Sequence, residues 1–124
     1  MEDEAYQRYV AINLPHARTI ASRIARTLEA IGALGEGTPL RQPLDELEHE
    51  LEGFEEDPPA EEALASADAV AERGRALVGV LLETPYRGDR LGQHVRNLFE
   101  CLGLAQEGAA LSLECGEDPA SLLR

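Results

Sequence analysis

A run of apolar residues between positions 17 and 31 is the feature that most restricts how this chain can fold. The steps between successive members alternate between three and four, which collects the side chains on one face of an α-helix. The members are Ala17, Ile20, Ile24, Leu28 and Ile31. Glycines follow at positions 32, 35 and 37, and glycine tolerates the left-handed backbone that ends many helices. The pattern therefore predicts an amphipathic helix that these glycines close.

The same helical phase continues toward the N-terminus, but a proline interrupts it. The residues that extend it are Tyr6, Tyr9, Val10 and Asn13. Pro15 lacks a backbone donor, and its ring disfavours a helical conformation at the preceding residue. We therefore expect the first helix to be kinked or broken near Leu14 and Pro15.

Three further segments carry helical patterns. Their apolar members are Leu44, Leu47, Leu51 and Phe54 in the first segment, Ala63, Ala67, Val70, Gly74, Leu77 and Leu81 in the second, and Leu91, Val95, Leu98, Leu102 and Ala105 in the third. Thr38, Pro39 and Pro43 are start signals for the first of these helices, and Asp89 suits the N-cap of the last. Prolines at positions 58, 59 and 85 separate the segments.

The fold class follows from these patterns. No alternation of apolar and polar residues lasts long enough for a β-sheet, and no internal repeat is present. A chain of 124 residues falls within the usual size of one domain. We therefore predict an all-α single domain over residues 1–124, built as an up-and-down bundle of about four principal helices. After Ala105 the helical phase is ambiguous, with one more turn expected after Asp118 and Pro119.

The apolar runs and the cysteines bear on the cellular compartment. The longest uninterrupted apolar run, residues 76–82, is far shorter than the roughly 18 residues that a membrane span requires. The N-terminus begins with acidic residues where a secretory signal would place basic ones. Only two cysteines occur, without a C-x-x-C pair, so we expect free, reduced thiols. We therefore predict a cytoplasmic protein that does not contact a membrane.

Negative charge is concentrated in one part of the chain. The formal net charge is −13, and residues 44–72 hold twelve acidic residues and no arginine. Ten of these acidic residues lie within residues 44–62, an acidic helix-linker segment that also contains His49. Residues 73–96, by contrast, hold five arginines and two acidic residues. The chain is therefore locally rather than uniformly acidic.

Glu46 and His49 have the E-x-x-H spacing by which di-iron bundles direct a carboxylate and an imidazole to one metal. No second E-x-x-H occurs in the sequence, so a complete site would need a symmetric dimer, as in the small encapsulated ferritins that this motif resembles. The ligands of such a site face the interior of the bundle. At about 100° per residue, His49 points roughly 160° away from Leu47 and Leu51. We therefore expect a solvated His49, no bound metal and no cofactor.

Four side chains are candidates for acid–base or nucleophilic chemistry: His16, His94, Cys101 and Cys115. His94 and Cys101 share a helix face, but two turns separate them by roughly 10.5 Å, too far for a direct hydrogen bond. The sequence has no phosphate-binding loop and no nucleophile elbow. We therefore predict no catalytic residues and a protein that is not an enzyme.

Arg87 and His94 have six residues between them, which resembles the R-x(4–6)-H signature of HEPN-type ribonucleases, themselves small helical bundles. The resemblance implies that the arginine and the histidine would orient and cleave RNA. A strongly anionic protein repels phosphate, although residues 73–96 are locally positive. The ribonuclease and the metal-binding bundle are therefore the lesser alternatives.

The acidic segment contains charges that helix formation does not require. Helix dipoles favour Asp45 and Glu46 at the start of one helix and Glu61 and Glu62 at the start of the next. No such reason exists for Glu50, Glu52, Glu55, Glu56 and Asp57. Together with Glu48, these residues form the predicted partner-binding set.

Two functions fit this set. We predict an interaction module or inhibitor that docks an acidic helical face onto a basic protein surface. The alternative is an inhibitor that imitates nucleic acid, as small anti-restriction and anti-CRISPR proteins do, because turns of an acidic helix place charges roughly 6 Å apart, close to the phosphate spacing. Its partner would be a DNA- or RNA-binding protein, and direct binding of nucleic acid is not expected. Self-association through the small side chains of residues 63–74 would give a homodimer.

Overall fold

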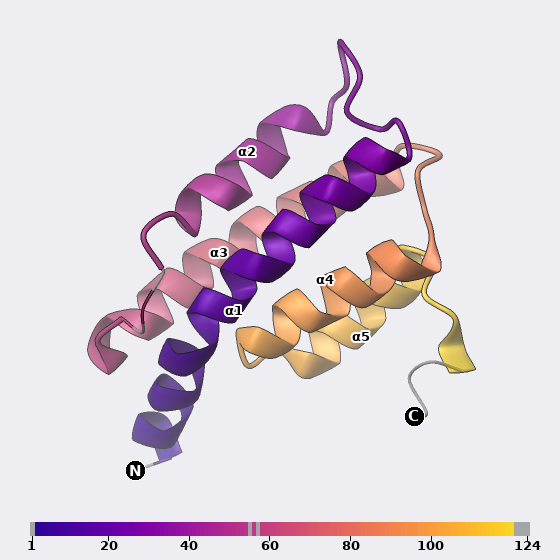
Figure 1. Ribbon diagram of the computed structural model, residues 1–124. Helices are drawn as coiled ribbons and strands as arrows, with labels where there is room; N and C mark the ends of the chain where they lie inside the picture. The colour runs from indigo at the N-terminus through magenta and orange to yellow at the C-terminus, as the bar shows by residue number, and fades with distance from the viewer. Residues whose placement is uncertain (1, 55, 57, 121–124) are drawn as a thin grey trace.

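The computed structural model describes residues 2–54, 56 and 58–120, and these residues form five α-helices and no β-strand (Figure 1). The helices are α1 (Glu2–Ala30), α2 (Arg41–Glu50), α3 (Ala60–Leu82), α4 (Asp89–Cys101) and α5 (Ala105–Glu114). The predicted all-α class is therefore confirmed. Within the described ranges, no helix combines the length and the apolar character that a membrane span needs.

Helix α1 is the centre of the arrangement. It packs against α2, α3 and α4, while α2 also packs on α3 and α5 packs on α4. In Figure 1, α2 lies on one side of α1, and the α4–α5 pair lies on the other. One cluster of buried apolar side chains joins these helices, with Phe99, Leu14 and Leu28 among its fully buried members.

Helix α1 runs through Pro15 as one helix. A proline inside a helix costs about 3 kcal/mol, because a hydrogen bond is lost and the ring crowds the preceding turn. Val10, Leu14 and Ala17, on both sides of the proline, have no exposed surface. Their packing offsets this cost, as tertiary contacts commonly do in helices. The prediction of a break near Leu14 is therefore wrong, and a kink there is not confirmed.

The apolar stripe of α1 ends earlier than predicted. Ala17, Ile20, Ile24 and Leu28 are buried, whereas Ile31 is 47% exposed. The helix ends at Ala30, and Gly32 turns the chain with a φ of 78°. Ile31 therefore lies beyond the last helical residue and does not join the core.

Two tyrosines near the start of α1 tie it to the end of α4. Tyr6 Oη donates a hydrogen bond to the carbonyl of Leu102 at 3.0 Å, and Tyr9 Oη donates to the carbonyl of Glu100 at 2.8 Å. The last carbonyls of a helix have no partner within the helix. The carbonyl of Glu100 also accepts from the N–H of Gly103 at 3.0 Å, so the two phenols add a link between the start of α1 and the end of α4.

The apolar patterns of α2, α3 and α4 are confirmed in nearly every position. Phe54 is only partly buried, and Ala105 is exposed. Ala105 leaves the stripe because α4 ends at Cys101 and Gly103 redirects the chain with a φ of 75°. The other predicted stripe residues are buried: Leu44, Leu47, Leu51, Ala63, Ala67, Val70, Gly74, Leu77, Leu81, Leu91, Val95, Leu98 and Leu102.

Helix α5 was not anticipated by the sequence patterns. Gly108 in its middle weakened the helical signal, since glycine costs roughly 1 kcal/mol relative to alanine inside a helix. In the structure, a Cβ at this position would lie 2.8 Å from Cβ of Phe99 and 3.0 Å from the carbonyl oxygen of Arg96. The glycine thus lets α5 approach α4 closely. The predicted up-and-down bundle of four helices is not confirmed in that form.

Asp89 does not cap α4. The N-cap is Gly88, and it makes no side-chain capping hydrogen bond. The Asp89 carboxylate instead accepts hydrogen bonds from Gln93 Nε2 and from the backbone N–H of Asp118, both at 2.7 Å. Asp89, the predicted N-cap of α4, therefore holds the segment that follows α5.

Candidate functional site

Helix α2, which carries Glu48 and Glu50 of the predicted partner-binding set, is held in a fixed orientation. Leu44, Leu47 and Leu51 form its buried side. Before the helix begins, Thr38 Oγ1 donates to the carbonyl of Ala33 at 2.8 Å and accepts from the N–H of Leu40 at 3.2 Å. The buried side and this turn fix which way the polar side chains of α2 point.

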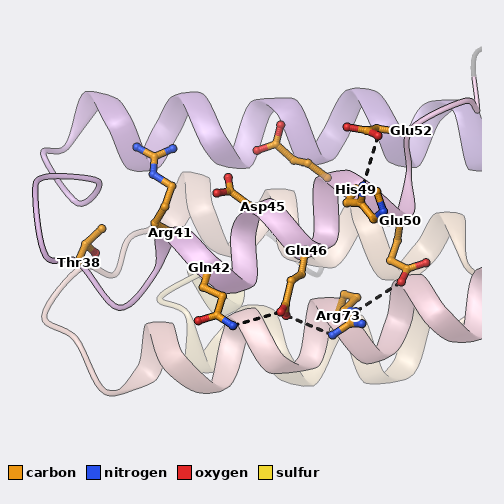
Figure 2. Close-up of a pocket in the computed structure, with 10 residues that line it drawn as sticks. Thr38, Arg41, Gln42, Asp45, Glu46, His49, Glu50, Glu52 and Arg73 are labelled. Atoms are coloured by element: carbon orange, nitrogen blue, oxygen red, sulfur yellow. Dashed lines mark hydrogen bonds and ion pairs between the residues drawn. The ribbon is translucent and has the colours of Figure 1, made fainter.

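The acidic residues of α2 that reach toward α3 share one ion-pair partner within the chain. Arg73 of α3 lies 3.2 Å from a carboxylate oxygen of Glu46 and 3.5 Å from one of Glu50 (Figure 2). Gln42 Nε2 also donates to Glu46 at 3.3 Å. Glu50 belongs to the predicted partner-binding set, and in the structure it takes part in this intramolecular ion pair.

Three acidic residues on and just after α2 lie near one another: Asp45 and Glu48 on the helix, and Glu52 in the turn that follows it. We call them the acidic strip, and the step of three residues places Asp45 and Glu48 on one face of α2. Asp45 and Glu52 are exposed, and Glu48 is half-buried. In Figure 2, Asp45 and Glu52 lie on the side of α2 opposite Arg73.

The charges of the acidic strip repel one another. Burial raises the pKa of the Glu48 carboxyl, Asp45 and Glu52 raise it further, and Arg41 acts in the opposite direction. A carboxylate with a matched basic partner shows the reverse behaviour, because the partner favours its charged form. Arg41 therefore offsets only part of the repulsion at Glu48, and Arg18 of α1 lines a small cavity beside Glu48 and Glu52.

An open cavity of about 750 Å³ lies over α2. Its walls include the acidic strip, the Glu46–Arg73–Glu50 group and Arg41 (Figure 2). The residues that line the cavity are mostly polar, and carboxylates outnumber arginines among them. A cationic side chain entering it would meet the strip on one wall and already paired carboxylates on the other.

His49 points outward, as its helical position predicted. Its side chain is 78% exposed, and Nδ1 lies 3.4 Å from the Glu52 carboxylate, whose side chain is 73% exposed. This contact is an ion pair only when the imidazole is protonated. Over the part of the chain that the structure describes, no three His, Cys, Asp or Glu residues group closely enough to hold a metal ion.

The predicted partner-binding set is divided by the structure. Glu48 and Glu52 belong to the acidic strip, and Glu50 is paired with Arg73. Glu56 is exposed between α2 and α3. Glu55 and Asp57 lie outside the described residues.

Sequence reasoning missed Asp45 and Arg73. Asp45 was assigned to the helix dipole, although its spacing from Glu48 already placed the two on one face. The pairing of Arg73 could not be read in the same way, since it depends on how α3 packs against α2.

The candidate acid–base and nucleophilic groups occupy separate environments. Cys101 and Cys115 are buried, and burial raises the pKa of each thiol to about 11. Burial, together with Arg23 and Arg90, lowers the pKa of the half-buried His94. His16 is exposed. Low-pKa thiols are the reactive ones, so both cysteines are shielded rather than activated.

Arg87, which pairs with His94 in the HEPN-like spacing, is oriented by the backbone. Arg87 Nη2 donates to the carbonyl of Leu82 at 2.9 Å. It also lines a cavity between α1 and the start of α4, and His94 is not among the residues lining that cavity.

Comparisons of this chain with protein-family models, with curated proteins and with solved structures find no match.

Proposed function

We propose that this protein is a non-enzymatic interaction module that docks the acidic strip of α2 onto a basic surface of a partner protein. The observation that carries the proposal is the division of charge on and just after α2: Glu46 and Glu50 share Arg73 as an ion-pair partner, while burial and repulsion from Asp45 and Glu52 raise the pKa of Glu48. A basic partner surface would relieve this repulsion. The surrounding negative charge would also speed the encounter at low ionic strength.

Binding of an arginine-rich helical peptide tests this proposal. We expect the wild-type chain to bind the peptide with an affinity that falls as salt is added. Neutralising the strip with Asp45→Asn, Glu48→Gln and Glu52→Gln should weaken binding about tenfold at low salt, because each exposed charge pair contributes roughly 0.2 to 1 kcal/mol. Isothermal titration calorimetry at two salt concentrations provides the measurement.

The matched control removes the same number of charges from α3, with Glu61→Gln, Glu62→Gln and Asp68→Asn. All three side chains are exposed, and none lines the cavity over α2. Binding by this control should stay close to wild type. If both triple variants lose the same affinity, the overall charge of the protein attracts the peptide, and the proposed role of the strip is wrong.

The alternative function, imitation of nucleic acid, rests on the spacing of the helical members of the strip, Asp45 and Glu48. Neighbouring charges three or four residues apart on a helix lie about 5–6 Å from one another, which approximates successive phosphates. The two functions differ in competition with duplex DNA or RNA. Partners captured on the wild-type chain and released by added duplex, but not captured by the strip variant, would favour the mimic. Partners that duplex leaves in place would favour general docking.

A further inference from the structure

A groove on another part of the surface has the opposite charge to α2. It has a volume of about 530 Å³ and is lined by residues from the C-terminal end of α1 and from the start of α4. Both helix ends can be found in Figure 1. Three arginines line it, Arg26 from α1, Arg87 just before α4 and Arg90 from its first turn. We call this cavity the arginine groove. Its volume is within the range of about 300 to 1,000 Å³ found for small-molecule sites.

The positive charge in the groove is available to a ligand. Arg26 and Arg90 are exposed, and Arg87 is held over the groove by its hydrogen bond to Leu82. Asp89 is the acidic residue in the lining, and its two carboxylate oxygens already accept hydrogen bonds from Gln93 and the N–H of Asp118. The groove is therefore net positive on a chain whose formal net charge is −13.

The positive potential of these arginines also acts on His94. Besides burial, Arg23 and Arg90 lower the pKa of His94, because they disfavour a further positive charge beside them. A fourth arginine, Arg23, therefore adds to the potential on this side of the molecule.

The groove also has an apolar part. Ile31 is 47% exposed and lines it beside Ala30, while the buried Leu91 contributes to the wall. A large aliphatic side chain left in solvent next to several arginines suits a ligand with an apolar body and an anionic head. Burying such a body would return favourable free energy of about 25 cal/mol for each Å² removed from water.

We infer that the arginine groove binds a small amphipathic carboxylate, with the carboxylate between Arg26 and Arg90 and the hydrocarbon body against Ile31. Planar guanidinium groups match the geometry of a carboxylate and form the stronger, charge-assisted class of hydrogen bond.

Titration with octanoate tests this inference, followed by calorimetry or by amide chemical shifts. We expect saturable one-to-one binding, with shifts at residues 26–31 and 87–91. Octanol, which has the same body without the charge, should bind at least about tenfold more weakly, because it cannot form the charge-assisted hydrogen bonds with the arginines. Octyl phosphate is the competing head group, and tighter binding of octyl phosphate than of octanoate would overturn the assignment to a carboxylate. Equal binding of octanoate and octanol would overturn the assignment of the arginines.

Variants locate the site. The double substitution Arg26→Gln with Arg90→Gln should weaken octanoate binding by about tenfold or more, and Ile31→Ser should weaken both octanoate and octanol. Arg41→Gln is the control, because Arg41 is an exposed arginine that lines the cavity over α2 instead. Circular dichroism would verify that each variant is folded. Octanoate affinity that is the same in the double variant and in wild type would refute the inference.

A lipid surface is distinguished from a soluble ligand by co-sedimentation with vesicles of anionic phosphatidylglycerol. Because the chain as a whole is strongly negative, we expect no co-sedimentation. Vesicle binding that depends on Arg26 and Arg90, in the absence of octanoate binding, would overturn the assignment to a soluble carboxylate.

Discussion

Two glycines in helix interiors show how different the role of the same residue can be. Gly92 of α4 is buried against the end of α5, where a Cβ would lie 2.6 Å from the carbonyl oxygen of Ser112 and 2.7 Å from the backbone nitrogen of Glu117. Gly79 of α3 is exposed, and no heavy atom lies within 4 Å of a Cβ built there. One glycine is required by packing, and the other only lowers helix propensity.

Substituting alanine at each position should therefore change stability in opposite directions. Gly92→Ala should lower the free energy of unfolding by about 1 to 3 kcal/mol, because the added methyl group meets backbone atoms that cannot rotate away. Gly79→Ala should raise it by up to about 1 kcal/mol. Urea denaturation of the two variants gives both values, and a loss at Gly79 as large as that at Gly92 would contradict the packing explanation.

At the scale of the element, the end of α5 is attached to α4 by a buried ion pair. The Glu117 side chain has no exposed surface, and its carboxylate lies 2.8 Å from Arg96 Nη2 and accepts from Arg96 Nε at 2.9 and 3.0 Å. Arg96 is 23% exposed and also reaches Glu100 at 3.3 Å. The hydrogen bond with Arg96, supported by Ser112, lowers the pKa of Glu117 despite its burial.

The two members of this pair should not be equally sensitive. Arg96→Met would leave the buried Glu117 carboxylate without a cation and should cost about 3 kcal/mol or more. Glu117→Gln would leave Arg96 partly solvated and still beside Glu100, and should cost only about 1 to 2 kcal/mol. Denaturant midpoints at neutral pH give the comparison, and a Glu117→Gln variant that is the less stable of the two would refute this account.

The helices differ in how much of them the sequence could predict. The stripes of α1 to α4 were readable because one face of each helix is apolar at the helical period. Helix α5 could not be predicted in this way. Gly108 and Gly92 allow α4 and α5 to pack closely, but in the sequence alone they resemble helix breakers. The passage of α1 through Pro15 likewise depends on burial on both sides, which no local pattern reports.

The candidate site was predictable to a similar extent. The outward direction of His49 followed from its position relative to Leu47 and Leu51. The sequence did not predict that Glu50 would be separated from the acidic strip, because this separation depends on where α3 places Arg73. The arginine groove combines Arg26 with Arg90 across 63 intervening positions of sequence, so only the packing of α1 against α4 brings it together.

At the scale of the whole molecule, two groups of carboxyls give opposite responses to acid. The pKa of Glu48 in the folded protein is raised above its ordinary value of 4.5. At pH values above the raised pKa, the repulsion at Glu48 lowers the stability of the fold. This loss is relieved as the pH falls through the raised pKa toward 4.5. The pKa values of Glu107 and Glu117 are lowered by Arg75 and Arg96. Their stabilising contribution is complete above 4.5 and is lost as the pH falls through the lowered values.

We therefore expect stability to rise slightly as the pH is lowered from 7 toward 5, and then to fall below about 4.5. Added salt at pH 7 should also raise the melting temperature, because it screens the repulsion in a chain of net charge −13. Calorimetric melting curves over pH and ionic strength test both expectations. A melting temperature that does not change between low and moderate salt would show that the acidic residues are already compensated.

The two buried thiols can report on how α4 and α5 separate. Cys101 is the last residue of α4, Cys115 directly follows α5, and both thiols have a pKa of about 11. An alkylating reagent attacks the thiolate, so each sulfur reacts only after the helix end that covers it has opened. The two labelling rates would then show whether α5 leaves α4 as one unit or begins to separate at one end.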